Sequence, residues 1–578
     1  MIRDLLKDDI AKASKKLGLG VGDVELVHPG DAQNGDYSTN IALRLASLAQ
    51  GKPQRNTHEI KQSPVEFAKK MADSLKGQPY IEKLEVAGPG FINFFIKPEI
   101  LSSEVENILK KKKIDLGLPA KKVTVEFTDP NPFKEFHIGH LFSNIVGESI
   151  SRLLEATGAT VKRANYQGDV GMHVAKTIWG IPKILEQTGE TFENQRKKPL
   201  KAKAFFLGQA YSLGAEQFET SEEVKAEIAD LNKQIFEQDP KIYSMYEEGR
   251  KWSLQYFEEI YKRLGTKFDF YYLESEVGRV GAKIVSENLK KGIFEKSEGA
   301  IIFPGEKFGL HNRVFINSLG LPTYEAKELG LAPTKYKDFP YDLSIIVTGN
   351  EIKDYFKVLL AALAQILPDL AKKTKHITHG MVRMPGGKMS SRLGNVILGE
   401  WLLDEAKERV KKEFASVSDQ LAEEIATGAV KYSLLKGNVG QEVNFSFEES
   451  ISLNGNSGPY LQYTHARCKS VLGKLKTQNS KPKDINFLGK VADDELKLLR
   501  ILCHFEEVVS DAAAAFAPNA VANFLHGLAQ KYNSLYNNLP ILKAREPERS
   551  RRLFLTRATA DILAKGLWLL GISAPEKM

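Results

Sequence analysis

The alternation of apolar and polar residues divides the chain into three regions, of which the first covers residues 1–113. Stretches with helical periodicity, such as PVEFAKKMADSLKG, occur there beside a strand-like run, GPGFINFFIK. In this run Phe91, Asn93 and Phe95 occupy alternate positions and should face the same side of a strand. We expect a small α+β domain over residues 1–113.

The second region, residues 114–400, has the pattern of an α/β domain. From Val123 the chain reads as a strand, a tight loop and a helix from about Gly139 to Gly158, and another strand follows near Val161. Parallel strands joined by a helix require a right-handed crossover, so we expect a doubly wound, Rossmann-type sheet. The predicted apolar helix face comprises Leu141, Phe142, Ile145, Val146, Ser149, Ile150 and Leu153.

Long charged helical segments interrupt this rhythm and predict an insertion at about 176–299. The sheet pattern resumes with AIIFP, RVFIN and LSIIVTG, the last of which is typical of a buried parallel strand. Beyond about Leu398 strand signals almost vanish, and segments such as LAEEIATGAVKYSLLKG have helical periodicity. Residues 401–578 should therefore form an all-α bundle.

Composition excludes several classes of protein. A chain of 578 residues is too long for one core, and 42% apolar with 27% charged residues fits a globular protein without a membrane-spanning run. The opening residues are amphipathic and partly acidic, unlike a signal or transit peptide. Cys468 and Cys503 lack metal-binding spacing, so we expect a reducing compartment, the cytoplasm, and no zinc. The net charge of +8 is mild and does not decide between an ordinary surface and polyanion binding.

Candidate chemistry begins at the first strand–helix junction, VTVEFTDPNPFKEFHIGHLF. Ligands in open α/β sheets bind at the carboxyl ends of strands, near helix N-termini. His137 and His140 could donate to phosphate oxygens of ATP there, and Gly139 leaves room for the adenosine. A histidine pair alone could equally be structural.

A second motif, HGMVRMPGGKMSSRLGN, has the features of a mobile loop that covers a triphosphate. Gly386 and Gly387 would act as a hinge, Lys388 supplies a cation, and Ser390 and Ser391 supply hydroxyl donors. Such a loop alone is usually a solvated turn, but both motifs in this order favour a site for ATP, with Mg²⁺ assisting.

The pair His137-Ile138-Gly139-His140 and Lys388-Met389-Ser390-Ser391 resembles the two signatures of class I aminoacyl-tRNA synthetases. The resemblance implies a Rossmann-type (HUP-like) catalytic domain that adenylates an amino acid. The family's second signature usually has a lysine where Ser391 stands, and arginyl enzymes that lack it resemble this chain in carrying one at the position of Lys134. The implied catalytic residues are Lys134, His137, His140 and Lys388, and the implied ATP contacts add Pro130, Gly139, Met389, Ser390 and Ser391.

EFTDPNPFKEFHIGHL is similar to the arginyl-tRNA synthetase pattern, which makes Glu126 and Asn131 candidate arginine ligands. LPTYEAKELGLA resembles that family's Tyr-x-x-x-Asp pair, so Tyr324 and Glu328 should contact the guanidinium; without the neighbouring matches they would be an exposed helical pair. Three residues depart from the pattern, namely Glu328, Asp129 and Ile352, where Asp, Ser and Gln are usual. We hypothesise that Asp129 binds the α-ammonium of arginine in place of the missing glutamine.

The flanking regions resemble the tRNA-binding parts of the same family. In the first, Phe91 could stack on a base of the tRNA elbow (D-loop) and Asn93 could read its edge, although Phe91 could also belong to the core. In the helical region, NSGPYLQYTHARCKSVL resembles the start of the anticodon-binding domain, and some of its tyrosines should be bundle core. The candidate anticodon contacts are Tyr460, Tyr463, His465, Arg467, Tyr532, Tyr536 and Met578.

We therefore expect a cytoplasmic, monomeric arginine–tRNA ligase that takes ATP, L-arginine and tRNA(Arg) and has no membrane partner. The resemblance further implies esterification at the 2′-hydroxyl and adenylate formation that depends on bound tRNA. Three alternatives remain: a cysteinyl or other class I synthetase, for which the expected thiol-reading zinc site is missing; an inactive, RNA-binding relative; and a small nucleotidyltransferase, which the length disfavours.

Overall fold

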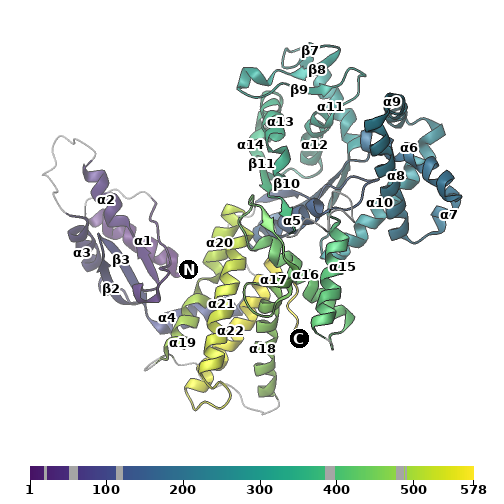
Figure 1. Ribbon diagram of the computed structural model, residues 1–578. Coiled ribbons are helices and arrows are strands. Elements are labelled where there is room, and N and C mark those ends of the chain that lie inside the picture. The colour runs from purple at the N-terminus through teal and green to yellow at the C-terminus, as the bar shows by residue number, and fades with distance from the viewer. Residues whose placement is uncertain are drawn as a thin grey trace.

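The computed structural model describes residues 1–17, 23–50, 63–111, 121–384, 397–414, 416–476, 487 and 491–578. An N-terminal domain, a central α/β domain and a C-terminal helical bundle follow one another along the chain (Figure 1). The expected boundary at residue 113 lies outside the described residues. No described helix is long and apolar enough to cross a membrane.

The N-terminal domain is α+β, as predicted. Its antiparallel sheet has the order β1-β3-β2 and is covered by helices on one side. In β3 the apolar residues Ile92, Phe94 and Ile96 are fully buried, which fixes the register of that strand. The elements are α1 (Ile2–Lys16), β1 (Tyr37–Thr39), α2 (Ile41–Gln50), α3 (Pro64–Leu75), β2 (Ile81–Ala87), β3 (Phe91–Ile96) and α4 (Pro98–Lys110).

The central domain contains a parallel sheet with the order β11-β10-β4-β5-β6. Its strands are β4 (Lys122–Glu126), β5 (Thr160–Gln167), β6 (Phe270–Leu273), β10 (Leu343–Gly349) and β11 (Thr374–His379). Helix α5 (Ile138–Ala156) follows β4, as the sequence predicts, but it is buried on nearly all sides rather than on one face. It is covered by the sheet and by the C-terminal bundle, so its polar residues are buried as well.

Helices α6 (Met172–Thr188), α7 (Phe192–Lys197), α8 (Leu200–Thr220), α9 (Glu222–Glu237) and α10 (Pro240–Leu264) form the predicted helical insertion. Strand β6 lies within the same predicted segment, yet it pairs with β5 in the main sheet. This strand has only four residues, too few for an alternating pattern to be recognised in the sequence. The remaining helices of the central domain are α11 (Glu274–Leu289), α12 (Tyr324–Asp338), α13 (Lys353–Ile366) and α14 (Pro368–Lys373).

The prediction that AIIFP and RVFIN belong to the main sheet is wrong. They form β8 (Ala300–Phe303) and β9 (Arg313–Ile316), which pair with β7 (Glu295–Ser297) in a separate antiparallel sheet. Glu298 and Gly299 connect β7 to β8 with φ of 48° and 80°, the left-handed pair of a two-residue hairpin. An apolar run alone does not distinguish such a hairpin strand from a parallel one.

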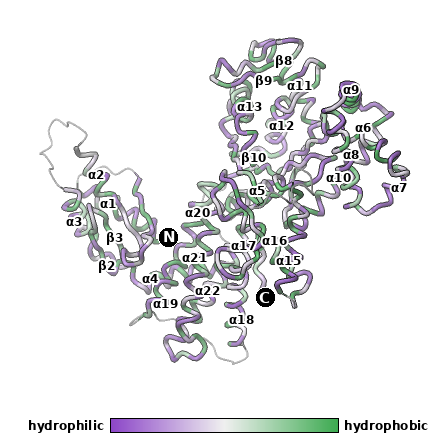
Figure 2. The backbone as a smooth tube through the Cα atoms, viewed as in Figure 1, coloured by the Kyte–Doolittle hydropathy of each residue, from purple (hydrophilic) through white to green (hydrophobic). Residues whose placement is uncertain are grey.

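The C-terminal region is a helical bundle, as predicted, and hydrophobic and hydrophilic residues alternate along α21 and α22 (Figure 2). Its helices are α15 (Gly399–Glu413), α16 (Asp419–Leu435), α17 (Phe447–Ile451), α18 (Gly458–Lys476), α19 (Asp493–Cys503), α20 (Phe505–Ala515), α21 (Pro518–Asn538) and α22 (Glu548–Leu569). A short parallel pair, β12 (Val382–Arg383) with β13 (Val443–Asn444), joins the bundle to the central domain.

A buried polar cluster connects the N-terminal domain to the bundle. The carboxylate of Asp36 accepts a hydrogen bond from the backbone of Ile96 at 2.7 Å and lies 2.8 Å from Nε of Arg500. Glu507 accepts a hydrogen bond from the hydroxyl of Tyr37 at 2.8 Å. Because these contacts cross the junction, separating the two domains would break the Asp36–Arg500 ion pair and the Tyr37–Glu507 hydrogen bond.

Candidate active site

The order in which the chain adds strands to the parallel sheet reverses at β4. Strands β5 and β6 extend from β4 to one side and β10 and β11 to the other. The loops that leave the carboxyl ends of β4 and β10 therefore diverge, and this is where sheets of this type bind ligands. Glu126 ends β4 and Gly349 ends β10, so the predicted site residues after Glu126 lie at this crevice.

The loop between β4 and α5 has a strained backbone. Thr128, Asp129 and Phe133 have φ of 81°, 44° and 69°, a region that residues other than glycine seldom adopt. The backbone N–H of Thr128 donates to Oγ of Ser143 at 2.9 Å, and that of Phe133 donates to Oγ of Ser253 at 2.9 Å. Pro130 is buried within this loop. Strain of this kind persists where surrounding contacts impose it, often at functional sites.

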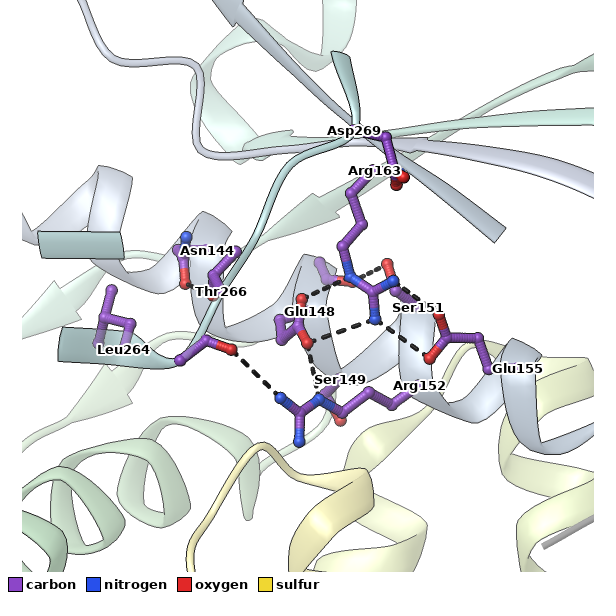
Figure 3. Close-up of polar contacts among 12 residues, drawn as sticks. Asn144, Glu148, Ser149, Ser151, Arg152, Glu155, Arg163, Leu264, Thr266 and Asp269 are labelled. Carbon is purple, nitrogen blue, oxygen red and sulfur yellow. Dashed lines mark hydrogen bonds and ion pairs between the residues drawn. The ribbon is translucent and has the colours of Figure 1, made fainter. Parts of the chain in front are cut away.

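Asn144 fixes this loop from below. Its amide donates to Oγ1 of Thr128 at 3.0 Å and accepts from the hydroxyl of Thr266 at 2.9 Å. Figure 3 shows Thr266, which follows α10, beside Asn144 of α5, and further along α5 Glu148, whose carboxylate binds Arg152 at 2.6 Å. Polar contacts along α5 thus hold both the strained loop and the helix that carries the two histidines.

His137 and His140 lie together at the start of α5. The backbone N–H of Gly139 donates to Nδ1 of His137 at 3.1 Å, and the N–H of His137 donates to Nδ1 of His140 at 3.3 Å. The two rings stack with their centroids 3.5 Å apart. A Cβ on Gly139 would lie 2.9 Å from Cε1 of His137, so the glycine makes room for this ring, where the sequence suggested adenosine.

Both imidazoles are neutral at physiological pH. Burial and the nearby charge of Lys134 lower the pKa of His137 to about 4, and burial lowers the pKa of His140 well below its ordinary value. Because Nδ1 of each ring accepts a hydrogen bond, the proton of the neutral ring is on Nε2. Each histidine therefore has one N–H donor suited to a phosphate oxygen.

Lys134 lies beside these histidines. Its charge lowers the pKa of His137, His140 and His173, and its Nζ lies 4.7 Å from the ring centroid of Tyr211. The structure thus brings a cation to the first signature. Lys388, Met389, Ser390 and Ser391 lie outside the described residues.

A cavity of about 350 Å³ opens beside the β4–α5 loop. Asp129, Asn131 and Tyr324, all predicted to bind the amino acid, line it. A Cβ on Gly168 would lie 2.3 Å from Oδ1 of Asn131, so this glycine is required for the asparagine to reach the cavity. The remaining lining residues are Tyr166, Gly168, Val170, Gly171, Met172, His173, Glu274 and Lys327.

Buried carboxylates outnumber cations beneath this cavity, and one of them, Glu328, does not itself line it. Burial, followed by the charge of Glu126, raises the pKa of both Asp129 and Glu328. Tyr324, which is 37% exposed at the cavity, lies with its hydroxyl beside Glu328, as the helical spacing predicts. A bound cation would relieve the repulsion among these carboxylates.

The structure corrects the expectation for Glu126. This side chain is fully buried and forms an ion pair with Lys335 of α12, and it does not line the cavity. It therefore supports the cavity from below. Ile352, where the family pattern has glutamine, is half-buried and packs against an apolar cluster.

Sequence reasoning missed Glu274, Lys327 and His173. Glu274 begins α11 directly after β6 and pairs with Lys327 at 2.6 Å. The ring of His173 contacts the backbone oxygen of Gly168 at 2.7 Å. Recognising β6 would have placed Glu274 at the carboxyl end of a strand, next to the site.

The predicted tRNA contacts of the N-terminal domain differ in exposure. Phe91 is 36% exposed at the start of β3 and is available for stacking. Asn93 is buried, and its amide oxygen accepts a hydrogen bond from the hydroxyl of Ser38 at 2.7 Å. The two residues share one face of β3, as the alternation predicts, but Asn93 is covered there and bonded to Ser38, so the structure corrects the expectation that it can read the edge of a base.

In the bundle, three of the predicted anticodon contacts gather at the surface. The guanidinium of Arg467 lies 4.9 Å from the ring centroids of both Tyr463 and Tyr536. Tyr536 and the terminal Met578 are exposed, and Tyr460 is half-buried.

Two other predicted contacts are corrected. Tyr532 is fully buried in the bundle, and His465 is buried with Nδ1 against the backbone oxygen of Pro575 at 2.8 Å. Both residues therefore support the surface from within. The sequence did not reveal this, because helical periodicity alone does not distinguish core tyrosines from exposed ones.

The described residues contain no cluster of three or more His, Cys, Asp or Glu side chains that could hold a metal ion. Cys468 and Cys503 are both buried and free.

Three family models match successive parts of the chain. Residues 1–96 match the arginyl tRNA synthetase N terminal domain, residues 104–447 match the catalytic domain of class I tRNA synthetases (R), and residues 461–578 match the DALR anticodon binding domain.

Relatives and solved structures agree with these matches. An arginine–tRNA ligase of Borrelia hermsii is 30% identical and covers 100% of this chain and 99% of its own length. One from Parabacteroides distasonis is 29% identical, covering 90% of this chain and 91% of its own. The Thermus thermophilus arginyl-tRNA synthetase structure aligns with a TM-score of 0.80 at 25% identity over the whole of both chains. The fold class predicted from the sequence is confirmed.

Proposed function

The chain belongs to the class I arginyl-tRNA synthetases, and we propose that it activates L-arginine with ATP and transfers the arginine to the 3′-terminal adenosine of tRNA(Arg). In the first step a carboxylate oxygen of arginine attacks the α-phosphorus of ATP, and the bond to pyrophosphate breaks. In the second, a terminal ribose hydroxyl, the 2′-hydroxyl in our proposal, attacks the arginyl carbonyl and AMP leaves.

One observation carries the choice of arginine: at and beneath the cavity beside the β4–α5 loop, buried carboxylates outnumber cations. Asp129 and Glu328 have raised pKa values, while Lys335 pairs with Glu126 and Lys327 pairs with Glu274. Arginine brings two cations, an α-ammonium and a guanidinium, which match two unmatched carboxylates.

The proposed arginine contacts follow from this placement. Asp129 and Asn131 bind the α-ammonium near the strained loop, and Glu328 accepts hydrogen bonds from the guanidinium. Tyr324 stacks on the guanidinium from the mouth of the cavity, and Glu274 offers a further carboxylate there. Glu126 and Lys335 keep Glu328 in position.

The proposed ATP contacts lie at the other end of the loop. The Nε2–H groups of His137 and His140 donate to phosphate oxygens, and Lys134 neutralises charge on the leaving pyrophosphate in place of the lysine missing at position 391. Lys388, Ser390 and Ser391 complete the site from the second signature, together with Pro130 and Met389. Mg²⁺ enters with ATP and neutralises its phosphates, because this ion usually binds through substrate phosphates.

The tRNA contacts are proposed for exposed residues: Phe91 at the tRNA elbow, and Tyr460, Tyr463, Arg467, Tyr536 and Met578 at the anticodon. We further propose that adenylate formation requires bound tRNA, that the protein is monomeric, and that it acts in the cytoplasm.

A binding experiment with a neutral isostere tests the choice of arginine. Citrulline has nearly the shape of arginine and lacks the guanidinium charge. Arginine at about 100 times its Kd should stabilise the protein by about 2.7 kcal/mol in thermal unfolding, and citrulline at the same concentration should not. Equal stabilisation by citrulline would contradict a site selected by charge.

A further inference from the structure

A second cavity, of about 240 Å³, lies between the helical insertion and the sheet half that follows it. The end of α9, the start of α10, helix α11 and the segment before α12 surround it. In Figure 1 these elements face one another across the gap between the two upper lobes of the molecule. Neither the ATP contacts nor the arginine contacts proposed above reach this cavity.

The second cavity adjoins the arginine cavity. Val170 lines both, and Ser275, which lines the second, follows Glu274, which lines the first. Nζ of Lys327 lies 2.6 Å from Glu274 and 5.6 Å from the ring centroid of Phe236, a wall of the second cavity. The two cavities therefore lie next to each other.

Three aromatic rings and two arginines line the second cavity, together with Glu237, which pairs with Lys233 at 3.8 Å. Phe236, Tyr243 and Tyr246 contribute rings, and the rings of the two tyrosines lie 5.6 Å apart. Arg250 is committed to the buried Asp169 at 3.0 Å, whereas Arg279 is exposed and forms no ion pair with any described residue. Aromatic faces beside an uncommitted arginine suit a base and its phosphate.

We propose that the second cavity holds an unpaired nucleotide of the tRNA acceptor end while the terminal adenosine is at the arginine cavity. The base packs against Phe236 and Tyr243, and Arg279 binds the phosphate. This inference rests on the proposed function, because tRNA is the substrate whose single-stranded end must reach the arginine cavity. A cavity facing a protein partner would not need to adjoin the site of transfer.

The test measures the equilibrium binding of a tRNA(Arg) transcript and of the same transcript without its three unpaired 3′ nucleotides. Each is bound to the unchanged chain and to Phe236→Ala, Arg279→Ala and Lys290→Ala variants. Lys290 is an exposed lysine just beyond the end of α11 that does not line the cavity, so it controls for loss of one positive charge. Arg279→Ala, at an exposed position, guards against a folding defect in Phe236→Ala.

Removing the 3′ nucleotides should weaken binding to the unchanged chain and to Lys290→Ala by about fivefold or more, the effect of losing one stacked base. In Phe236→Ala and Arg279→Ala the truncation should have a clearly smaller effect. An equal truncation effect in all four proteins, or none in the unchanged chain, would overturn the proposal. The binding measurement does not depend on catalysis. A failure of the proposed function would therefore be seen in a separate arginylation assay, as a protein that binds tRNA but does not arginylate it.

Discussion

Asp129 combines strain and charge at one position. Its left-handed backbone places the carboxylate in the cavity, where Oδ1 accepts the N–H of Tyr166 at 2.9 Å. Asn144 holds the preceding Thr128 in the conformation that this placement requires. This placement supports our proposal that Asp129 binds the substrate, at a position where the family pattern has serine.

Asp129→Asn should raise the KM for arginine about 10- to 100-fold, because a hydrogen bond to a charged partner contributes about 1.5–3 kcal/mol. The KM for ATP should change little. Steady-state aminoacylation with each substrate varied in turn measures both constants. An unchanged KM for arginine in Asp129→Asn or Asp129→Ser would show that the carboxylate does not bind the α-ammonium.

Arginine binding should also release protons. Without ligand, burial and the charge of Glu126 raise the pKa values of Asp129 and Glu328, and an arriving cation lowers them again. The affinity for arginine should therefore rise with pH and level off once the carboxylates ionise without ligand. Calorimetry in phosphate and Tris buffers measures the released protons, and Glu328→Gln should reduce their number. Equal heats in both buffers would argue against this charge coupling.

At the scale of elements, the two signature segments contribute unequal parts of the phosphate site. The first segment, at the start of α5, has an ordered pair of imidazole donors with Lys134 beside them. The second lacks one lysine at Ser391. We propose that Lys134 of the first segment supplies the missing cation.

Lys134→Ala should lower kcat for arginylation about 100- to 1000-fold, since it removes one group that stabilises charge in the transition state. Adding Ser391→Lys to this variant should restore part of the activity, because it returns a lysine to the usual position. Lys203→Ala, which removes an insertion lysine beside Trp252, provides a matched control and should retain activity. Full activity of Lys134→Ala would rule out the substitution.

Local sequence patterns predicted the elements that local contacts determine. Tyr324 and Glu328 are one helical turn apart, and the backbone N–H of His137 donates to the ring of His140. The sequence spacing of each pair therefore indicated that its two side chains lie together. The pairing of Glu126 with Lys335 joins residues 209 positions apart and could not be read from either segment. Likewise, the exposure of Tyr536 and the burial of Tyr532 depend on how α21 packs against its neighbours.

At the scale of the whole molecule, the N-terminal domain and the bundle form one continuous body through the cluster at Asp36, Arg500, Tyr37 and Glu507. Helix α4 also lies along α19. The proposed tRNA contacts at Phe91 and at Tyr536 lie on these two joined domains, so the junction sets the distance between them.

Asp36→Ala should destabilise the protein by about 3–5 kcal/mol, because it leaves the charge of Arg500 at a buried junction without its carboxylate. It should also raise the KM for tRNA and leave the KM for arginine unchanged. Urea unfolding and aminoacylation kinetics measure these effects, with the exposed Asp8→Ala as the control. Identical unfolding midpoints for both variants would show that the cluster does not stabilise the junction.

The most direct test of the account is ATP–pyrophosphate exchange with each amino acid, with and without total tRNA, followed by transfer of labelled amino acid to tRNA. We predict that arginine is the only amino acid that supports exchange, that it does so only when tRNA is present, and that arginine is attached to the tRNA. No exchange with arginine under either condition, or attachment of a different amino acid, would contradict it.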